Sequence, residues 1–311
     1  GAGAVTFIAQ NGIQVSGGAT GNIVGNTVSG HSYTPFSYVS TGMLLYGAGP
    51  TNTSGNTVSE NQVGIYVIDT PGSHDGNTVS ASSAGTGSPG FWGMVVDSPP
   101  PAHQPSPLDD LAAPGPRAQL PSVNSLVATP VQVVTVTNNV LTGDGTAAGI
   151  GLEADSGFGS FDIALTATNN YIQNWGVGVE IFECGAPYTC TGTTFANLNV
   201  NLNSITGNLT GYDHYNASFT ADGEKNWWSH ASGPSGSGPG TGDPVSANVD
   251  FTPWLCDGTD TDPAIGFQPD PDNTCPMVKV HIVKYLDGSQ ATTTSANGYG
   301  FPMVSTWTAP N

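Results

Sequence analysis

A short phrase of Gly, Asn, Thr, Val and Ser returns along the chain and limits what the chain can fold into. It reads GNTVSG at residues 25–30, GNTVSE at 55–60 and GNTVS at 76–80. Weaker copies follow as NNVLTG at 138–143, NNYIQN at 169–174 and NSITGN at 203–208. A repeat unit of this size cannot bury its own apolar face, so such units stack on one another around a continuous core.

The asparagines of the phrase measure the length of the repeat. Asn26, Asn56, Asn77, Asn139, Asn170 and Asn203 are separated by 30, 21, 62, 31 and 33 residues. We interpret the interval of 62 residues, which contains a Pro-rich stretch, as two coils with an insertion. Between the asparagines lies a second phrase, in which apolar residues alternate after glycine, such as GIYVI at 64 and GIGLE at 149. Each unit therefore contains short strands separated by Gly, Asn and Ser turns.

These patterns predict an all-β fold, a right-handed parallel β-helix. The apolar residue two positions after each asparagine should stack inside the helix at one height: Val28, Val58, Val79, Leu141, Ile172 and Ile205. The asparagines should lie in turns, where Asn tolerates a left-handed φ and its amide can form a ladder with the next coil. A β-sandwich is the alternative, but sandwiches do not repeat one turn phrase in register.

The charge balance excludes several classes of partner. The 311 residues include 4 Lys+Arg and 23 Asp+Glu, which gives a formal net charge of −19. Such a surface repels phosphate backbones and anionic lipid headgroups, so we expect no nucleic acid and no membrane as partner. No apolar run reaches the roughly 18 residues that a membrane-spanning helix requires.

The four cysteines form two local pairs, Cys184 with Cys190 and Cys256 with Cys275. No histidine stands at zinc-ligand spacing beside either pair, so we expect two disulfides and an extracellular or cell-surface location, with reduced thiols as the alternative. Asn52, Asn208 and Asn216 begin Asn-x-Ser/Thr sequons, which matter only in a host that glycosylates. Because the chain opens at Gly1 within the pattern, we expect a mature or excised piece of a longer protein.

The turn phrases and residues 225–255 together resemble a known family. The segment reads KNWWSHASGPSGSGPGTGDPVSANVDFTPWL. It is similar to the closing segment of bacterial cell-surface right-handed parallel β-helix repeat proteins, and the resemblance covers residues 1–255. The chain departs from that family at Ser229, where the family usually has glycine. The resemblance implies a fold and a surface location but no activity, because members include polysaccharide-active enzymes and plain stalk or matrix modules.

The predicted β-helix occupies residues 1–255, with an insertion at 98–130 and a closing cap at 225–255. The open end of a β-helix exposes sheet edges and core, which favours aggregation unless the end is covered. We expect the aromatic side chains of the closing segment to plug that end; a platform for sugar stacking is the alternative. These residues are Trp227, Trp228, Phe251 and Trp254. The Pro-rich insertion is either a loop packed on the helix or a partner-binding arm.

Two further segments follow the cap. Residues 256–276 form an acidic loop between the second pair of cysteines, with aspartates at Asp257, Asp260, Asp262, Asp270 and Asp272. Closely spaced aspartates can supply oxygen ligands for calcium, although no cofactor is required and a solvated loop is the alternative. Residues 277–311 form a β tail or the start of a further module. Its strand pattern, which can pair with its own helix or with a neighbouring molecule, comprises Val278, Val280, Ile282, Lys284 and Leu286.

A stripe of carboxylates is the candidate chemical site. If Met94, Ile150 and Val177 share a column of the stack, Asp97, Glu153 and Glu180 share the column three residues on, and Asp213 joins them. Neighbouring strands lie about 4.8 Å apart. Carboxyl groups on adjacent strands suit a retaining glycosidase, and groups two strands apart suit an inverting one. One carboxyl should then have a raised pKa or hold a cation. Alternatively, these acids end their strands and face water.

The scarcity of basic residues weighs against an enzyme. Activity on uronate polymers needs cations, and the chain has only Arg117, Lys225, Lys279 and Lys284. We therefore expect a non-enzymatic structural module of an extracellular surface protein: a stalk, envelope layer, adhesin or self-assembling filament. It would associate with itself or with neighbouring modules. The alternative is a glycoside hydrolase or glycan-binding protein that uses Asp97, Glu153, Glu180 and Asp213 on a neutral polysaccharide.

Overall fold

The structure, a computed structural model, describes residues 10–32, 40–86, 90–98, 131–156, 162–183, 194–215 and 217–275, and two short strands near the C-terminus. The chain divides into two units, residues 1–276 and residues 277–311. Nearly all of the first unit's secondary structure is β-strand. Within the described ranges the one helix is the four-residue α1 (Ser83–Thr86).

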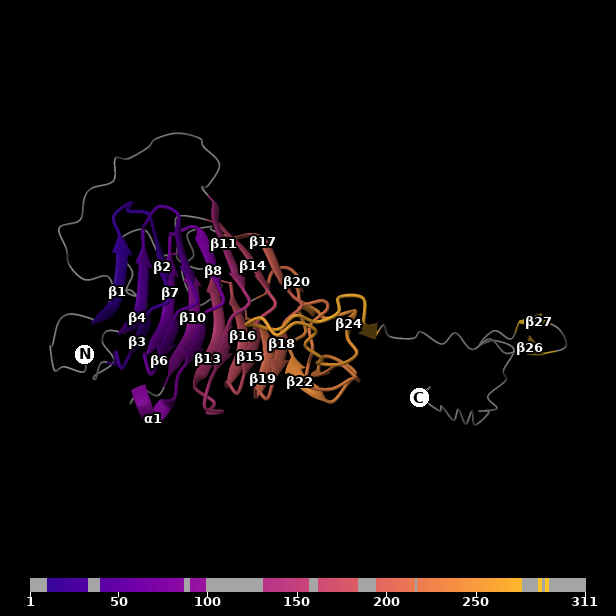
Figure 1. Cartoon of the computed structure of the whole chain (residues 1–311). Coiled ribbons are helices and arrows are strands. Elements are labelled where there is room, and N and C mark those ends of the chain that lie inside the picture. The colour runs from indigo at the N-terminus through magenta and orange to yellow at the C-terminus, as the bar shows by residue number, and fades with distance from the viewer. Residues whose placement is uncertain are drawn as a thin grey trace, which may run out of the picture. The chain divides into compact units, whose positions relative to one another are not determined.

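The first unit is a parallel β-helix, as predicted, in which each coil adds one strand to each of three parallel sheets (Figure 1). Sheet A contains, in spatial order, β1 (Asn11–Ser16), β4 (Thr41–Tyr46), β7 (Val63–Ile68), β10 (Phe91–Asp97), β13 (Gly149–Asp155), β16 (Val177–Phe182), β19 (Thr210–Tyr215), β22 (Gly242–Val245) and β21 (Pro234–Gly236). Sheet B contains β2 (Gly21–Val24), β5 (Thr51–Ser54), β8 (Gly72–Asp75), β11 (Val131–Thr137), β14 (Asp162–Thr168), β17 (Phe195–Asn201), β20 (Ala221–Asp222) and β23 (Val249–Asp250). Sheet C contains β3 (Thr27–Ser29), β6 (Thr57–Ser59), β9 (Thr78–Ser80), β12 (Val140–Thr142), β15 (Tyr171–Gln173) and β18 (Ser204–Thr206).

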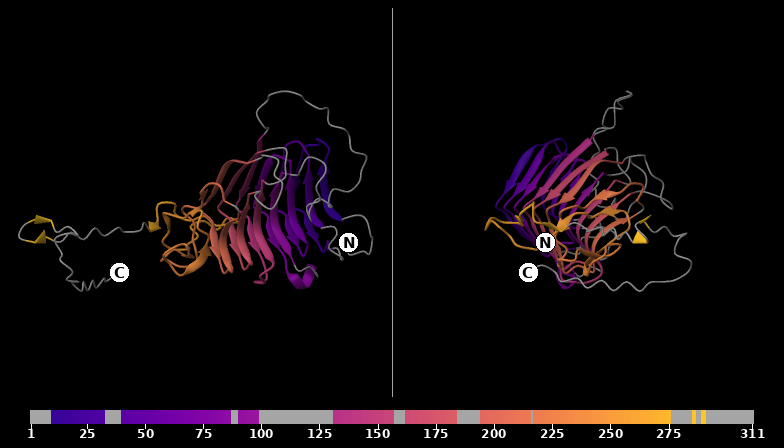
Figure 2. Two further views of the ribbon diagram at one scale, coloured as in Figure 1. Left: turned by 180° about the vertical axis from the view of Figure 1, so that it is seen from behind. Right: turned by 90° about the vertical axis from the view of Figure 1, so that its right-hand side faces the viewer.

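The core runs along the inside of the three sheets. Alternate residues of each strand point inward, and the predicted inner column on sheet C is confirmed, since each member pairs with the next: Val28, Val58, Val79, Leu141, Ile172 and Ile205. All six are buried. The two views of Figure 2 show the coils of this unit following one another in chain order, from indigo to orange. Apolar burial in these columns is the main favourable contribution to folding.

The interpretation of the 62-residue interval as two coils is wrong. β9 pairs directly with β12, so Val79 and Leu141 are neighbours in the stack. The insertion leaves the helix after β10 on sheet A, and the chain returns at β11 on sheet B. An insertion within a turn lengthens the interval without adding a coil, because both flanking strands belong to the same coil. The insertion itself lies outside the described residues.

A ladder of buried asparagines lines the turn between sheets B and C. The backbone N–H and the side-chain amide of Asn56 both donate to Oδ1 of Asn77, at 3.1 and 2.8 Å. The same two hydrogen bonds join every successive pair of asparagines in this column, which we call the asparagine ladder. It comprises Asn26, Asn56, Asn77, Asn139, Asn170, Asn203 and Asn226. The ladder was predicted from the repeat, but its last member, Asn226 in the closing segment, was not.

The sequence pattern predicts a left-handed φ at the asparagine of each turn. In the structure it is the residue before the asparagine that has the left-handed φ. These residues have φ between 53° and 66° and are Gly25, Gly55, Gly76, Asn138, Asn169, Leu202 and Lys225. The ladder asparagine donates its own N–H to the next amide, so the chain makes its sharp bend one position earlier. Glycine fills that position in the first three phrases because it has no side chain to clash in this conformation.

The closing segment packs against the C-terminal end of the core. Trp228 and Trp254 are buried, and the indole N–H of Trp254 donates to the carbonyl of Ala231 at 3.0 Å. Phe251 packs against Trp254, and both Trp227 and Phe251 are partly exposed. Ser229 adopts a left-handed φ of 62°. Its hydroxyl hydrogen-bonds to the carboxylate of Asp243 at 2.7 Å, which stabilises a turn that glycine would otherwise favour.

In the second unit the described residues form one short antiparallel pair, β26 (Tyr285–Leu286) with β27 (Ser289–Gln290). Of the predicted assembly strand, this pair includes Leu286 alone. Val278, Val280, Ile282 and Lys284 lie outside the described residues, so the prediction of a donated strand stays a prediction.

Candidate functional site

Three carboxylates form a row on the outer face of sheet A. Glu153 of β13 pairs with Glu180 of β16, which pairs with Asp213 of β19. In each strand the residues on either side of the acid are buried, so the acid projects from the opposite face of the sheet. Adjacent strands lie about 4.8 Å apart, which sets the spacing of the three residues. We call Glu153, Glu180 and Asp213 the acid row.

The expected place of Asp97 in this row is wrong. Met94 pairs with Leu152 and not with Ile150, so Asp97 pairs with Asp155. The GIGLE phrase contains two glycines, and the alignment of β10 with β13 by the first glycine is off by two residues. A shift of two keeps the side chain on the same face. Asp97 therefore lies beside the acid row, in the next column of the outer face.

Burial and mutual repulsion raise the pKa of the first two members of the row. The side chain of Glu153 is buried, with the residue 7% exposed. Burial raises the pKa of Glu153 well above its usual value, and the charge of Glu180 adds to the effect. Burial, followed by the charge of Asp213, raises the pKa of Glu180 to about 7. A carboxyl that holds a proton near neutral pH is typical of functional sites.

More acids continue this electrostatic pattern at the end of the strands. The hydroxyl of Tyr66 donates to Oδ2 of Asp97 at 2.6 Å. Burial raises the pKa of Asp69 to about 8, with a smaller contribution from the charge of Asp97. No Lys or Arg belongs to any strand of sheet A. Like charges therefore gather on this face without a basic side chain from the sheet itself.

Aromatic rings lie on both sides of the acid row. Phe182 and Tyr215 follow Glu180 and Asp213 by two residues and stack with their ring centres 5.2 Å apart and their planes 12° apart. Tyr215 is 46% exposed. On the other side, Trp92 of β10 pairs with Ile150 of β13, and its side chain lowers the pKa of Glu153 by hydrogen bonding, against the larger effect of burial.

Sequence reasoning missed four residues of this surface: Tyr66, Asp69, Trp92 and Asp155. Asp155 carried a usable signal, because it stands two residues after Glu153 and strand alternation places both on one face. The other three carried none, since their place depends on the register between β7, β10 and β13. That register is fixed by packing between coils and not by the repeat phrase.

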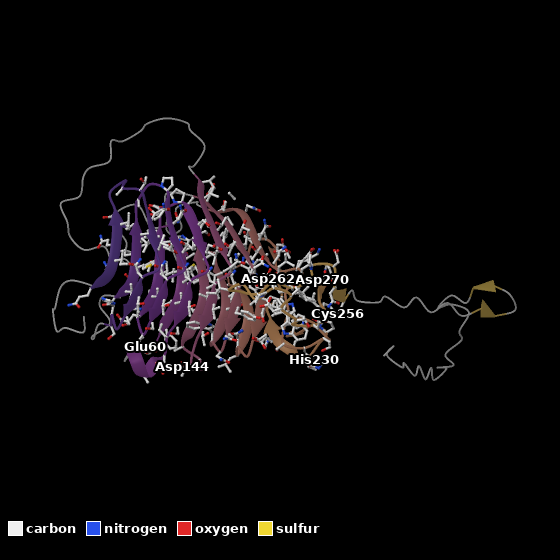
Figure 3. All side chains as sticks on the ribbon, viewed as in Figure 1. Glu60, Asp144, His230, Cys256, Asp262 and Asp270 are labelled. Atoms are coloured by element: carbon white, nitrogen blue, oxygen red, sulfur yellow. A yellow bond between two sulfur atoms is a disulfide. The ribbon has the colours of Figure 1, made fainter. Side chains whose placement is uncertain are left out.

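The acidic loop is closed by a disulfide between Cys256 and Cys275, and it lies against the coils (Figure 3). The N–H of Phe267 donates to the carbonyl of Asn169 at 2.8 Å, and the amide of Asn169 donates back to the carbonyl of Phe267 at 2.9 Å. The hydroxyl of Tyr171 donates to Asp260 at 3.1 Å. The loop therefore acts as a strap along the asparagine side of the helix.

The strap gives the calcium prediction no support. Asp257, Asp262 and Asp270 each accept a backbone N–H two residues further on, which uses them as turn formers. Asp272 also lies in this loop, but within the described ranges no three His, Cys, Asp or Glu side chains converge as a metal site. Calcium binding stays an untested prediction.

The other predicted sites divide between described and undescribed residues. Cys184, Cys190 and Asn216 lie outside the described residues, so that disulfide and that sequon stay predictions. Asn52 is exposed. Asn208 is buried, and its amide donates to the carbonyl of Ile172 and to Asp243, at 3.1 and 3.0 Å. A glycan on Asn208 is therefore incompatible with this packing.

Comparison of the chain with protein-family models, with curated proteins and with solved structures found no match. In the described residues no helix is long and apolar enough to span a membrane.

Proposed function

We propose that this chain is a non-enzymatic structural module of a bacterial cell-surface protein, a rigid rod within a stalk, envelope layer, adhesin or filament. The observation that carries the proposal is the asparagine ladder, which continues without interruption through seven coils. Each step gives a buried backbone N–H its hydrogen-bond acceptor and adds a bond from the side-chain amide to the next coil. A stack in which every coil is fixed to the next resists bending and local opening.

Two other features support a load-bearing, extracellular part. The C-terminal end of the core is covered by Trp228 and Trp254, so this end offers little open core to aggregation. The strap is held by a disulfide at its two ends, and disulfides persist in oxidising compartments. The resemblance of the closing segment to surface β-helix proteins points in the same direction.

Negative-stain electron microscopy with light scattering tests self-assembly, which is the filament or layer form of the proposal. The full chain is imaged with and without calcium, beside a variant that lacks residues 277–311. Filaments or ordered arrays that disappear in the shortened variant would support assembly through the tail. A monomer near 31.6 kDa under every condition would contradict self-assembly of this chain. Far-UV circular dichroism of both proteins checks that the β-helix is unchanged.

A further inference from the structure

The strap, residues 256–275, lies across the turns of three consecutive coils. A Cβ on Gly266 would lie 2.4 Å from Cα of Asn138 and 2.6 Å from the carbonyl oxygen of Asn169, so the two backbones touch there. One coil earlier, a Cβ on Gly76 would lie 3.1 Å from Cγ2 of Ile265. These three turns follow β8, β11 and β14, which are neighbours in sheet B. The strap therefore joins these coils from the outside.

The strap is anchored to the coils by a short segment. Phe267 is fully buried, and its ring centre lies 5.3 Å from that of Tyr171. The next residue, Gln268, donates its side-chain amide to Oδ1 of Asn138 at 3.2 Å. Residues 261–265, by contrast, are exposed. A small apolar anchor and a few hydrogen bonds thus hold most of the strap's contact with the turns.

Charge opposes the docking of the strap. It contains the five aspartates Asp257, Asp260, Asp262, Asp270 and Asp272, and the sequence has no Lys or Arg between the two cysteines. The surface that receives the strap is acidic as well, because the amide of Asn138 also donates to Asp75, at 2.8 Å. Like charges at short distance repel one another. The strap is therefore held in place against electrostatic repulsion.

The disulfide is the covalent part of this attachment and is open to attack. Cys256 and Cys275 are both partly exposed, so a thiolate in solution reaches the bond. The bond closes a loop across 19 residue positions, which limits the freedom that the strap gains when it leaves the coils. The asparagine ladder does not need the strap, since its hydrogen bonds run from coil to coil.

We propose that the strap is a redox-controlled element, docked on the turns while Cys256 and Cys275 are joined and released when a dithiol reduces them. The dithiol gives two electrons and two protons to the disulfide and becomes a cyclic disulfide, and the chain keeps two thiols. Release uncovers the outer side of the turns at Asn138 and Asn169 and the ring of Tyr171. This goes beyond the structural role, because it gives the rod a surface that the oxidised chain hides. It does not depend on self-assembly.

Hydrogen exchange followed by mass spectrometry tests the release in the full chain, with and without dithiothreitol. We expect exchange in peptides from residues 257–274 to rise about a hundredfold on reduction, and exchange in peptides from residues 163–175 to stay unchanged. The double variant Cys256→Ser, Cys275→Ser should show the same rise without dithiothreitol. The matched control Cys184→Ser, Cys190→Ser should keep the strap protected until dithiothreitol is added. Salt at 1 M, which screens charges beyond about 3 Å, should make the rise smaller.

Several results would overturn the proposal. Equal exchange of the strap in the oxidised, reduced and double-variant chains would mean that the disulfide does not control docking. A simultaneous rise in residues 163–175 would mean that the disulfide supports the whole β-helix and not a separable strap. The same holds for a disulfide that dithiothreitol leaves intact in the folded chain, as judged by alkylation and mass. None of these results bears on filament formation, so the structural role is tested separately.

Discussion

The asparagine ladder and the acid row stack polar side chains in the same way, one per coil at the same spacing, with opposite electrostatic results. An amide both donates and accepts, so Asn139 and Asn170 join at 2.9 Å and every further pair closes similarly. An ionised carboxylate only accepts, so Glu153 and Glu180 repel each other and tend to keep a proton. The β-helix therefore stacks charged and uncharged side chains at the same spacing, and the chemistry of the stacked side chain decides whether a column stabilises the fold.

This difference suggests a division of roles along the surface of one rod. Six of the seven ladder asparagines are buried, and their side chains bond to one another along the core, so the ladder offers no surface to a partner there. In the acid row, burial and the repulsion between neighbouring carboxyl groups raise the pKa of Glu153 and of Glu180.

The largest effect is expected from breaking the ladder in its middle. Asn170→Ala removes the acceptor of the Asn139 N–H and amide and the donor to the carbonyl of Val136. Several buried groups then lose partners, so we expect a loss of about 3 kcal/mol in the free energy of unfolding. Urea denaturation followed by circular dichroism measures it.

Asn201→Ala is the matched control for the ladder. Asn201 lies on the outer face of sheet B, where its amide donates to Asp222 at 3.1 Å. We expect a loss below about 1 kcal/mol there. Equal losses in the two variants would mean that the ladder adds nothing beyond an ordinary surface hydrogen bond.

A smaller effect, of opposite sign, is expected from neutralising the acid row. Glu180→Gln removes a carboxyl whose pKa is raised to about 7 in the folded chain. Such a group costs stability as pH rises from its unfolded pKa, near 4.3, through the folded value. The free energy of unfolding of Glu180→Gln should therefore exceed that of the unaltered chain by about 2 kcal/mol at pH 8 and by much less at pH 5. Melting temperatures of the two proteins at each pH measure the difference. A gain that does not depend on pH would contradict the assignment of the shift to Glu180.

Glu180→Gln must be compared with the unaltered chain at the same pH, because His74 makes the stability of both proteins change with pH in the opposite direction. Burial lowers the pKa of His74 to about 4, so its imidazole stays neutral in the folded chain above about pH 4. In the unfolded chain the same imidazole binds a proton below about pH 6.5. Stability from this residue is lost as pH falls from about 6.5 towards 4. His74 is present in both proteins, so its contribution cancels in the difference in melting temperature.

How far the sequence predicts the structure differs between the same two regions. The ladder and the inner column follow from a phrase that repeats in register, so six of the seven ladder residues and all six inner residues could be named. The seventh, Asn226, stands in a segment that no longer repeats the phrase. The acid row was predicted in part: Glu153, Glu180 and Asp213 fall together, whereas Asp97 does not.

The reason for this failure is physical. Register between coils is set by which side chains fill the core, and the two glycines of GIGLE leave two alignments that place the same residues inward. The site also depends on burial and on ring contacts between coils, which a sequence does not encode locally. No spacing rule indicates that Glu153 is buried or that Phe182 stacks on Tyr215.

The smallest expected effect concerns the bend that precedes each ladder asparagine, where the first three coils have glycine and a later coil has Leu202. Leu202 adopts a left-handed φ of 59°, a conformation that disfavours residues with a side chain. Leu202→Gly removes this strain but enlarges the freedom of the unfolded chain, so we expect a net gain of about 0.5 kcal/mol. Thr168→Gly, in the last residue of strand β14, should lower the free energy of unfolding by about 1 kcal/mol, because it relieves no strain. The midpoints of urea denaturation, at an unchanged m-value, measure the stability of the two variants. A lower midpoint in both would mean that packing of the Leu202 side chain contributes more to stability than its backbone conformation costs.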